Sequence, residues 1–151
     1  MIVNIKEIGV IHTPYKELSD CPIQPPGSRN NGEVEVFKEY VEGLSDLDGF
    51  SHIILIFTLH KSDGYSLNVK PFLDDHLRGL FATRSPRRPN PIGMSVVKLV
   101  KIRENVLSVN GVDMIDGTPL LDIKPYVPDF DERDNVRTGW LNEARLKEMK
   151  R

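Results

Sequence analysis

Short runs of β-branched and aromatic residues, separated by residues that form turns, recur along most of this chain. Several runs alternate apolar with polar residues, which is the periodicity of a strand with one buried face. Residues 51–60, SHIILIFTLH, are instead apolar almost throughout, which predicts a strand covered on both faces. The expected strands span residues 5–13, 33–37, 51–60, 79–83, 93–104, 105–116 and 119–127.

Helices are few in this pattern, and they do not alternate with the strands, which argues against a doubly wound α/β sheet. Residues 40–50 predict a short helix or turns, and residues 139–150 predict a helical tail. A long hairpin is expected to turn at Glu104 and Asn105. The expected fold class is therefore mainly β, as an antiparallel barrel or a strongly curled sheet with few short helices.

The composition is that of a soluble globular chain of 151 residues with a net charge of −2. A single cysteine, Cys21, excludes an internal disulfide and a zinc site built on cysteines. The four histidines show no spacing typical of ligands, so no metal is expected. No signal segment and no apolar run of membrane-spanning length is present, so we expect a cytoplasmic protein with no membrane partner.

The segment FATRSPRRPNPIG, residues 81–93, concentrates basic charge. It lies within residues 76–103, which hold seven Lys or Arg and no Asp or Glu, although the whole chain is near neutral. Its prolines fix φ and stiffen the loop, so the arginines are held at low entropic cost. Guanidinium groups bind carboxylates and phosphates through two parallel hydrogen bonds. The loop therefore indicates an anion-binding site; the alternative is a solvated loop whose prolines only block strand extension.

A second motif, VDMIDGTPLLDIKPY at residues 112–126, ends one predicted strand and begins the next. Its DGTP sequence is a plain turn, so a simple hairpin explains part of it. Asp113 and Asp116 nevertheless lie near a strand end, where functional sites are often built. Lys124 and Tyr126 share a strand face because they are two residues apart.

Four segments together resemble the YaeB-like or TsaA-like family, the tRNA (N(6)-threonylcarbamoyladenosine) methyltransferases. They are IGVIHTPY, GFSHIILIF, GLFATRSPRRPNPIGMSVVKL and VDMIDGTPLLDIKPYVP, within residues 5–128. The resemblance implies a single-sheeted β-barrel that binds S-adenosylmethionine, acts as a homodimer and methylates the modified exocyclic nitrogen of threonylcarbamoyladenosine beside the tRNA anticodon. It implies a methyltransferase domain over residues 1–128 and a partly helical tail over residues 129–151. Many bacterial members carry an additional C-terminal domain, which this tail does not match.

The resemblance also implies which residues contact the cofactor. These are Pro22, Ile23, Gln24, His60, Lys61, Arg84, Met94, Val112, Asp113, Met114 and Asp116. On chemical grounds, Arg84 suits the cofactor carboxylate, and Asp113 or Asp116 suits the ribose hydroxyls. Met94, Val112 and Met114 suit an apolar slot for the adenine.

A positioned base would help the reaction that the resemblance implies. The ureido nitrogen of threonylcarbamoyladenosine is a poor nucleophile, because its lone pair is delocalised into the carbonyl group, and removal of its proton would help methyl transfer. Three residues remain candidates for this catalytic role: His60, Asp113 and Asp116.

Binding of the tRNA anticodon loop is assigned to other residues. Arg87 and Arg88 would face RNA phosphates or the threonyl carboxylate, with Lys124 and Tyr126 as further contacts. Tyr126 and Phe130 are either platforms for unpaired bases or residues that pack at the barrel end. Two alternative functions stay open: a non-catalytic RNA-binding barrel, and a small-molecule methyltransferase without an RNA partner.

Overall fold

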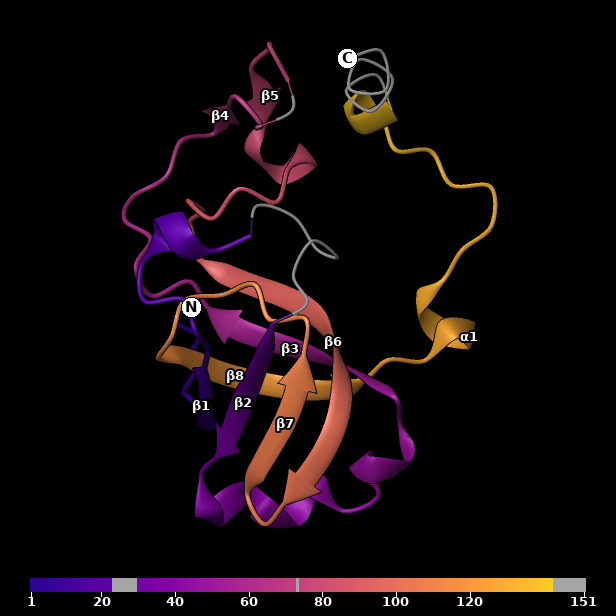
Figure 1. The fold of residues 1–151 in the computed structure, drawn as a ribbon. Helices are drawn as coiled ribbons and strands as arrows, with labels where there is room; N and C mark the ends of the chain where they lie inside the picture. The colour runs from indigo at the N-terminus through magenta and orange to yellow at the C-terminus, as the bar shows by residue number, and fades with distance from the viewer. Residues whose placement is uncertain (23–29, 73, 143–151) are drawn as a thin grey trace. The chain divides into compact units, whose positions relative to one another are not determined.

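The computed structural model describes residues 1–22, 30–72 and 74–142, and the chain divides into two compact units (Figure 1). The first, here called the barrel unit, comprises Met1–Lys61 and Ile92–Val127. The second, here called the arginine-loop unit, comprises Ser62–Pro91 and Pro128–Arg151. Each unit is described by itself below.

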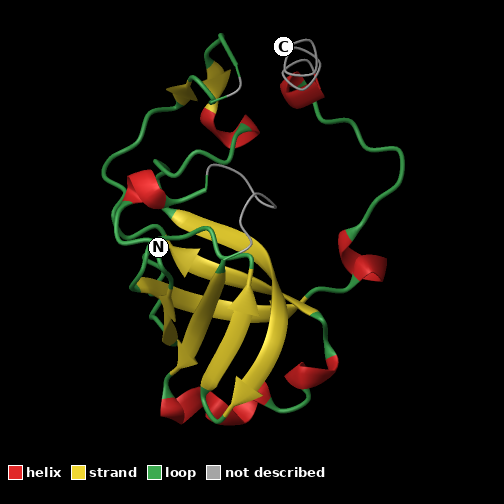
Figure 2. Ribbon diagram, viewed as in Figure 1, coloured by secondary structure: helices red, strands yellow, loops and turns green. Residues whose placement is uncertain are grey.

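The barrel unit is a closed antiparallel barrel of six strands in the order β1-β2-β7-β6-β3-β8 (Figure 2). The strands are β1 (Gly9–His12), β2 (Asn31–Val36), β3 (His52–Thr58), β6 (Ile92–Arg103), β7 (Val106–Asn110) and β8 (Thr118–Pro125). Short 3-10 helices connect them: η1 (Leu18–Asp20), η2 (Lys38–Leu44) and η3 (Leu47–Gly49). The prediction of a mainly β, single-sheeted antiparallel barrel is therefore confirmed.

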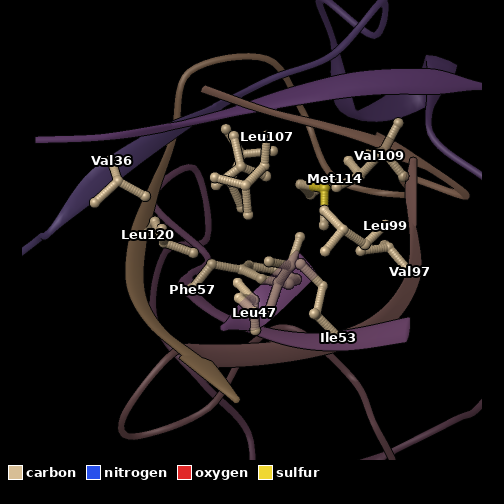
Figure 3. Close-up of a cluster of buried hydrophobic side chains, with 14 of the residues drawn as sticks. Val36, Leu47, Ile53, Phe57, Val97, Leu99, Leu107, Val109, Met114 and Leu120 are labelled. Atoms are coloured by element: carbon tan, nitrogen blue, oxygen red, sulfur yellow. The ribbon is translucent and has the colours of Figure 1, made fainter. Parts of the chain in front are cut away.

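The interior of the barrel is filled by apolar side chains from all six strands (Figure 3). In β3 these are Ile53, Leu55 and Phe57, whereas Ile54 and Ile56 point outward and remain partly exposed. The prediction that this strand is covered on both faces is thus wrong. In a closed barrel only one face of each strand looks into the core, so an apolar run does not require two covering layers.

Several predicted elements are shorter than their sequence pattern suggests. The long hairpin is confirmed, with Glu104 at φ 55° in its turn, but β7 ends at Asn110 and leaves residues 111–116 irregular. The expected strand at residues 79–83 is wrong, because only Arg78–Gly79 is extended and a 3-10 helix follows. Residues 40–50 form 3-10 helices, as the expectation of a short helix or turns allowed.

The arginine-loop unit contains little regular structure. The two-residue strands β4 (Asn68–Val69) and β5 (Arg78–Gly79) pair with each other. They are followed by η4 (Leu80–Ala82), and α1 (Pro128–Asp131) belongs to the same unit. Most of the predicted tail helix, from residue 143 on, lies outside the described residues.

Gly93, in the PNPIG sequence, pairs with Phe57 across β6 and β3. A Cβ atom at Gly93 would lie 2.5 Å from Cε2 of Phe57, whose ring is buried. We therefore expect Gly93→Ala to lower the free energy of unfolding by about 1–3 kcal/mol, the usual cost of overpacking a core. Urea denaturation measures this. Gly43→Ala is the matched control, since a Cβ there meets nothing within 4 Å; equal midpoints for the two variants would contradict the prediction.

Candidate functional site

The strand registers bring most of the predicted cofactor residues of the barrel unit to one end of the barrel. Thr58 at the end of β3 pairs with Ile92 at the start of β6, and Phe57 pairs with Leu120 near the start of β8. The end of β1 pairs with the start of β8 and with β2, and the end of β7 pairs with the start of β2 and with Lys98 in the middle of β6. The hydrogen bond from Ser95 of β6 to Asp113, which follows β7, joins the two levels. His60, Lys61, Met94 and residues 112–116 therefore gather at this end, here called the His60 end.

Asp113 follows β7 and faces β6. Its carboxylate Oδ1 accepts a 2.6 Å hydrogen bond from the hydroxyl of Ser95, a buried residue of β6. Burial raises the pKa of Asp113 above the usual range of an aspartate, although the bonds from Ser95 and from its own backbone N–H act in the opposite direction. An oriented carboxylate with a raised pKa is a stronger base than an exposed one.

His60 follows β3 and is half-buried. Its Nδ1 atom is buried and has no hydrogen-bond partner within the part of the chain that the structure describes. Burial, followed by the charge of Lys61, lowers the pKa of His60, while a bond to the Thr58 backbone opposes this. The imidazole is therefore neutral at physiological pH, and an unpaired buried ring nitrogen suits a bound ligand.

Asp116 is engaged within the protein. Its Oδ1 accepts the backbone N–H of Thr13 at 2.9 Å, and its Oδ2 accepts from Nζ of Lys16 at 2.8 Å. The Lys16 bond, followed by the Thr13 bond, lowers the pKa of Asp116. Together with the bond from Gly117 N–H to the Ile11 carbonyl, these contacts join the start of β8 to the end of β1.

The three apolar residues predicted for the adenine slot are placed differently from one another. Val112 and Met114 are buried in the barrel core and present almost no surface to solvent. Met94 is 52% exposed on β6. Pro22 and Cys21 are both partly buried. The pKa of the Cys21 thiol is raised by burial and then by the charge of Asp113, so Cys21 and Pro22 lie near Asp113. Ile23 and Gln24 lie outside the described residues.

Lys124 and Tyr126 lie toward the opposite end of the barrel. Lys124 pairs with Ile54 in the register, and Tyr126 N–H donates to the carbonyl of His52 at the start of β3. Lys124 also forms a 3.0 Å ion pair with Asp122. The structure therefore does not bring these two residues together with the His60 end.

In the arginine-loop unit the three loop arginines differ in their contacts. Arg88 donates from Nη1 to the carbonyls of Thr83, at 2.9 Å, and Ser85, at 3.1 Å. Its guanidinium also lies over the ring of Phe81, 5.9 Å from the centroid. Arg84 and Arg87 are exposed. Arg88 therefore braces the loop, whereas Arg84 and Arg87 present their charges to solvent.

Another set of contacts in this unit joins distant parts of the chain. Buried Asp74 accepts a hydrogen bond from Nε of Arg78, and the Arg78 guanidinium lies over the ring of Trp140 at 5.9 Å. Trp140 in turn donates its indole N–H to the carbonyl of Ala82 at 2.8 Å. Arg78 is the first cause of the strongly lowered pKa of Asp74, which is charged at neutral pH. Residues 74–82 are thus tied to the segment around Trp140.

Sequence reasoning missed Ser95, Lys16 and Trp140, because their partners are 18 to 100 residues away along the chain. Within the described ranges, no three His, Cys, Asp or Glu side chains come close enough to hold a metal ion. No helix among these residues is long and apolar enough to cross a membrane.

Comparison with known proteins identifies the family. Residues 10–132 match the family described as the tRNA-methyltransferase O N-terminal domain. The chain belongs to this family. The resemblance found in the sequence motifs is thereby confirmed. The matched residues of the TrmO N-terminal family include β2, β3, β6, β7 and β8 and all of β1 except its first residue, Gly9.

Individual members of the TrmO N-terminal family and their relatives are similar over most of this chain. A probable S-adenosyl-L-methionine-binding protein of Pyrococcus abyssi is 52% identical over 95% of the chain and 78% of the relative. The tRNA (adenine(37)-N6)-methyltransferase of Escherichia coli is 37% identical over 95% of the chain and 66% of that enzyme. The crystal structure of TrmO from Pseudomonas aeruginosa matches with a TM-score of 0.79 and 37% identity, over 93% of this chain and 63% of that one. The chain thus spans less than two thirds of the last two proteins.

Proposed function

We propose that this chain is a cytoplasmic, S-adenosylmethionine-dependent tRNA methyltransferase. The observation that carries the proposal is the match of residues 10–132 to the tRNA-methyltransferase O N-terminal domain. Relatives with similar sequences are named as an S-adenosyl-L-methionine-binding protein and as tRNA methyltransferases. At the His60 end of the barrel, His60 offers a buried ring nitrogen for a ligand and Asp113 offers a carboxylate that can take up a proton, which would help methyl transfer to a nitrogen.

The residues at the His60 end suit a cofactor with mixed polar and apolar parts. Buried Nδ1 of His60 has no partner among the described residues and can accept a hydrogen bond. Met94 adds exposed apolar surface on β6. When bound, S-adenosylmethionine supplies a methyl group on a positively charged sulfur. The remaining predicted contacts, Pro22, Ile23, Gln24, Lys61, Val112 and Met114, stay part of the proposal.

Between the two aspartates, the pKa shifts favour Asp113 as the base. Its pKa is raised, which increases its basicity, whereas that of Asp116 is lowered. We prefer Asp113 to His60 because a hydrogen bond from Ser95 orients its carboxylate, whereas buried Nδ1 of His60 has no partner among the described residues. Asp116 is also held by Thr13 and Lys16. We therefore assign Asp113 to removal of the proton from the target nitrogen, His60 to hydrogen bonding of a ligand, and Asp116 to support of the β1–β8 contact.

The finer substrate that we propose is the threonylcarbamoyl-modified adenosine beside the anticodon. Its ureido N–H is a weak acid, so a carboxylate of raised pKa is suited to accept that proton. The methyl group would pass to the nitrogen as its bond to the sulfonium sulfur breaks, and S-adenosylhomocysteine would leave. Arg84 is proposed to bind the cofactor carboxylate and Arg87 an RNA phosphate, since both are exposed. Arg88, first assigned to RNA, is reassigned to bracing the loop because its Nη1 already serves two carbonyls. Lys124 and Tyr126 remain proposed RNA contacts.

A methyl-transfer assay tests the function and separates the alternatives. The purified full chain is incubated with isotopically labelled S-adenosylmethionine and tRNA that carries or lacks the threonylcarbamoyl group. Nucleosides are then analysed by mass spectrometry. We expect labelled methyl only on threonylcarbamoyladenosine. A chain that binds tRNA but shows no cofactor binding by calorimetry would be an RNA-binding barrel. One that binds the cofactor but shows no salt-dependent tRNA binding would act on small molecules.

We also propose that the chain acts as a homodimer. An apolar row, Ile92, Val96 and Val100, is exposed on the outer face of β6, and partly exposed Ile54 and Ile56 lie beside it on β3. Burial of such a row against a second copy removes apolar surface from water. Light scattering at micromolar concentration should give about twice the 17.2 kDa mass of the chain. Val96→Lys should shift the mass toward that of a monomer; a wild-type monomer that still methylates tRNA would refute the dimer.

A further inference from the structure

Phe81 is an aromatic residue that the proposed roles leave unused. Its side chain is 75% exposed, so it contributes little to the core of the arginine-loop unit. It also lies within residues 76–103, which carry seven Lys or Arg and no acid. An exposed ring in a basic, acid-free segment is the combination that proteins use to bind single-stranded nucleic acid.

The Phe81 ring is held by contacts on the following loop. The Arg88 guanidinium lies over the ring, and its Nη1 is fixed by the carbonyls of Thr83 and Ser85. The Thr83 hydroxyl donates to the carbonyl of Leu80 at 2.7 Å and accepts the N–H of Ser85 at 3.3 Å. The ring and its cation are therefore ordered before any ligand arrives, which lowers the entropic cost of binding.

The backbone beside Phe81 is fixed by a second, independent contact. The neighbouring carbonyl, that of Ala82, accepts the indole N–H of Trp140 at 2.8 Å, and Arg78 lies over the Trp140 ring. Arg78 is anchored in turn by buried Asp74. Both sides of the Phe81 peptide are thus restrained, although the ring itself stays open to solvent.

We infer that Phe81, braced by Arg88, is a stacking platform for an unpaired base of the bound tRNA. The inference rests on the proposed function, because it takes the RNA partner from there and adds the mode of contact. A base can stack on the ring face that Arg88 does not cover, and the guanidinium adds a cation–π contribution. Since every base has an aromatic face, this contact strengthens binding to a loop without selecting one base.

Phe130 provides a matched comparison. It is an equally large aromatic residue of the same unit and is 71% exposed. However, it lies in α1 between Asp129 and Asp131, where carboxylates oppose the approach of RNA phosphates. Phe81 and Phe130 therefore differ mainly in charge environment, and we expect only Phe81 to contribute to RNA affinity.

The test is tRNA affinity at several salt concentrations for the wild-type chain and for Phe81→Ala, Phe81→Leu, Phe81→Tyr and Phe130→Ala. We expect Phe81→Ala to weaken binding roughly 5- to 150-fold, the range for loss of one aromatic residue that stacks on a base. The slope of log affinity against log salt should stay unchanged, because no phosphate contact is lost. Phe81→Leu should also lose affinity, since it keeps apolar volume without an aromatic face, whereas Phe81→Tyr and Phe130→Ala should bind as the wild type.

Each other outcome has a distinct meaning. If Phe81→Ala binds tRNA as tightly as the wild type, or if Phe81→Leu alone does so, Phe81 does not stack on a base. Either result would leave the proposed function intact. A loss confined to Phe130→Ala would place the platform in α1 instead. A fall in molecular mass on light scattering of Phe81→Ala would show that Phe81 contacts a second copy rather than RNA. If the wild-type chain binds no tRNA, the proposed function itself fails.

Discussion

Replacement of Asp113 by asparagine should reduce the rate of methyl transfer to tRNA by roughly 10²- to 10⁴-fold, the usual contribution of a positioned general base. Asparagine keeps the shape of the side chain and an oxygen that can accept the 2.6 Å bond from Ser95, but it cannot take up a proton. In the wild-type chain, kcat/KM should rise with pH through the raised pKa of Asp113 and then level off. That acid limb should be missing from the residual activity of Asp113→Asn.

The stability of Asp113→Asn serves as its control. A carboxyl group whose pKa is higher in the folded protein than its ordinary value of 3.8 binds its proton more tightly when folded. Its contribution to the free energy of unfolding therefore falls as the pH rises above that value. The uncharged variant should be at least as stable as the wild type at pH 7, by thermal unfolding. A stable variant with wild-type kcat would show that Asp113 is not the base, and the same measurements on His60→Asn would then decide whether His60 is.

Replacement of Arg84 by alanine should weaken binding of S-adenosylmethionine by roughly 10- to 150-fold, which corresponds to about 1.5–3 kcal/mol for a hydrogen bond to a charged group. The reason is that its exposed guanidinium is proposed to bind the cofactor carboxylate. Isothermal titration calorimetry with the cofactor alone measures this without tRNA. Unchanged affinity would remove Arg84 from the cofactor contacts.

Arg87→Ala is the matched control for Arg84→Ala, since both residues are exposed arginines of the same loop. It should leave cofactor affinity unchanged, and it should reduce the salt slope of tRNA binding by about one unit, as loss of one phosphate contact does. If Arg87→Ala loses the cofactor instead, the two assignments must be exchanged. Arg88 is unsuitable as this control, because its removal would release the carbonyls of Thr83 and Ser85.

The fold class could be read from the sequence because strand periodicity and turn residues are local features. The hairpin at Glu104 and the strand at residues 51–60 were both found in this way. Where local patterns failed, the tertiary structure had overridden them. Residues 80–82 have strand-like composition but form a 3-10 helix. In this helix Leu80 is buried, whereas its neighbour Phe81 is exposed.

The family was also accessible from the sequence, because whole motifs are similar to those of the family, and the match over residues 10–132 bears this out. The same motifs supplied the candidate residues, which stay predictions. The roles of those residues were not accessible. His60, Asp113 and Asp116 were equivalent candidates, since nothing in a linear pattern says which carboxylate meets Lys16 and which meets Ser95.

The sequence by itself determined that strands form, that the fold is mainly β and antiparallel, and which segments are candidates for the site, while its periodicity left a barrel and a curled sheet open. The tertiary structure alone decided between these two and set the surroundings of the candidate residues. Closure of the barrel set the registers that gather His60, Met94 and Asp113 at one end, and burial there shifted the pKa values of His60 and Asp113 in opposite directions. Burial and long-range contacts exist only after folding, and they determine the electrostatic free energy of each group, so no local pattern could have supplied them.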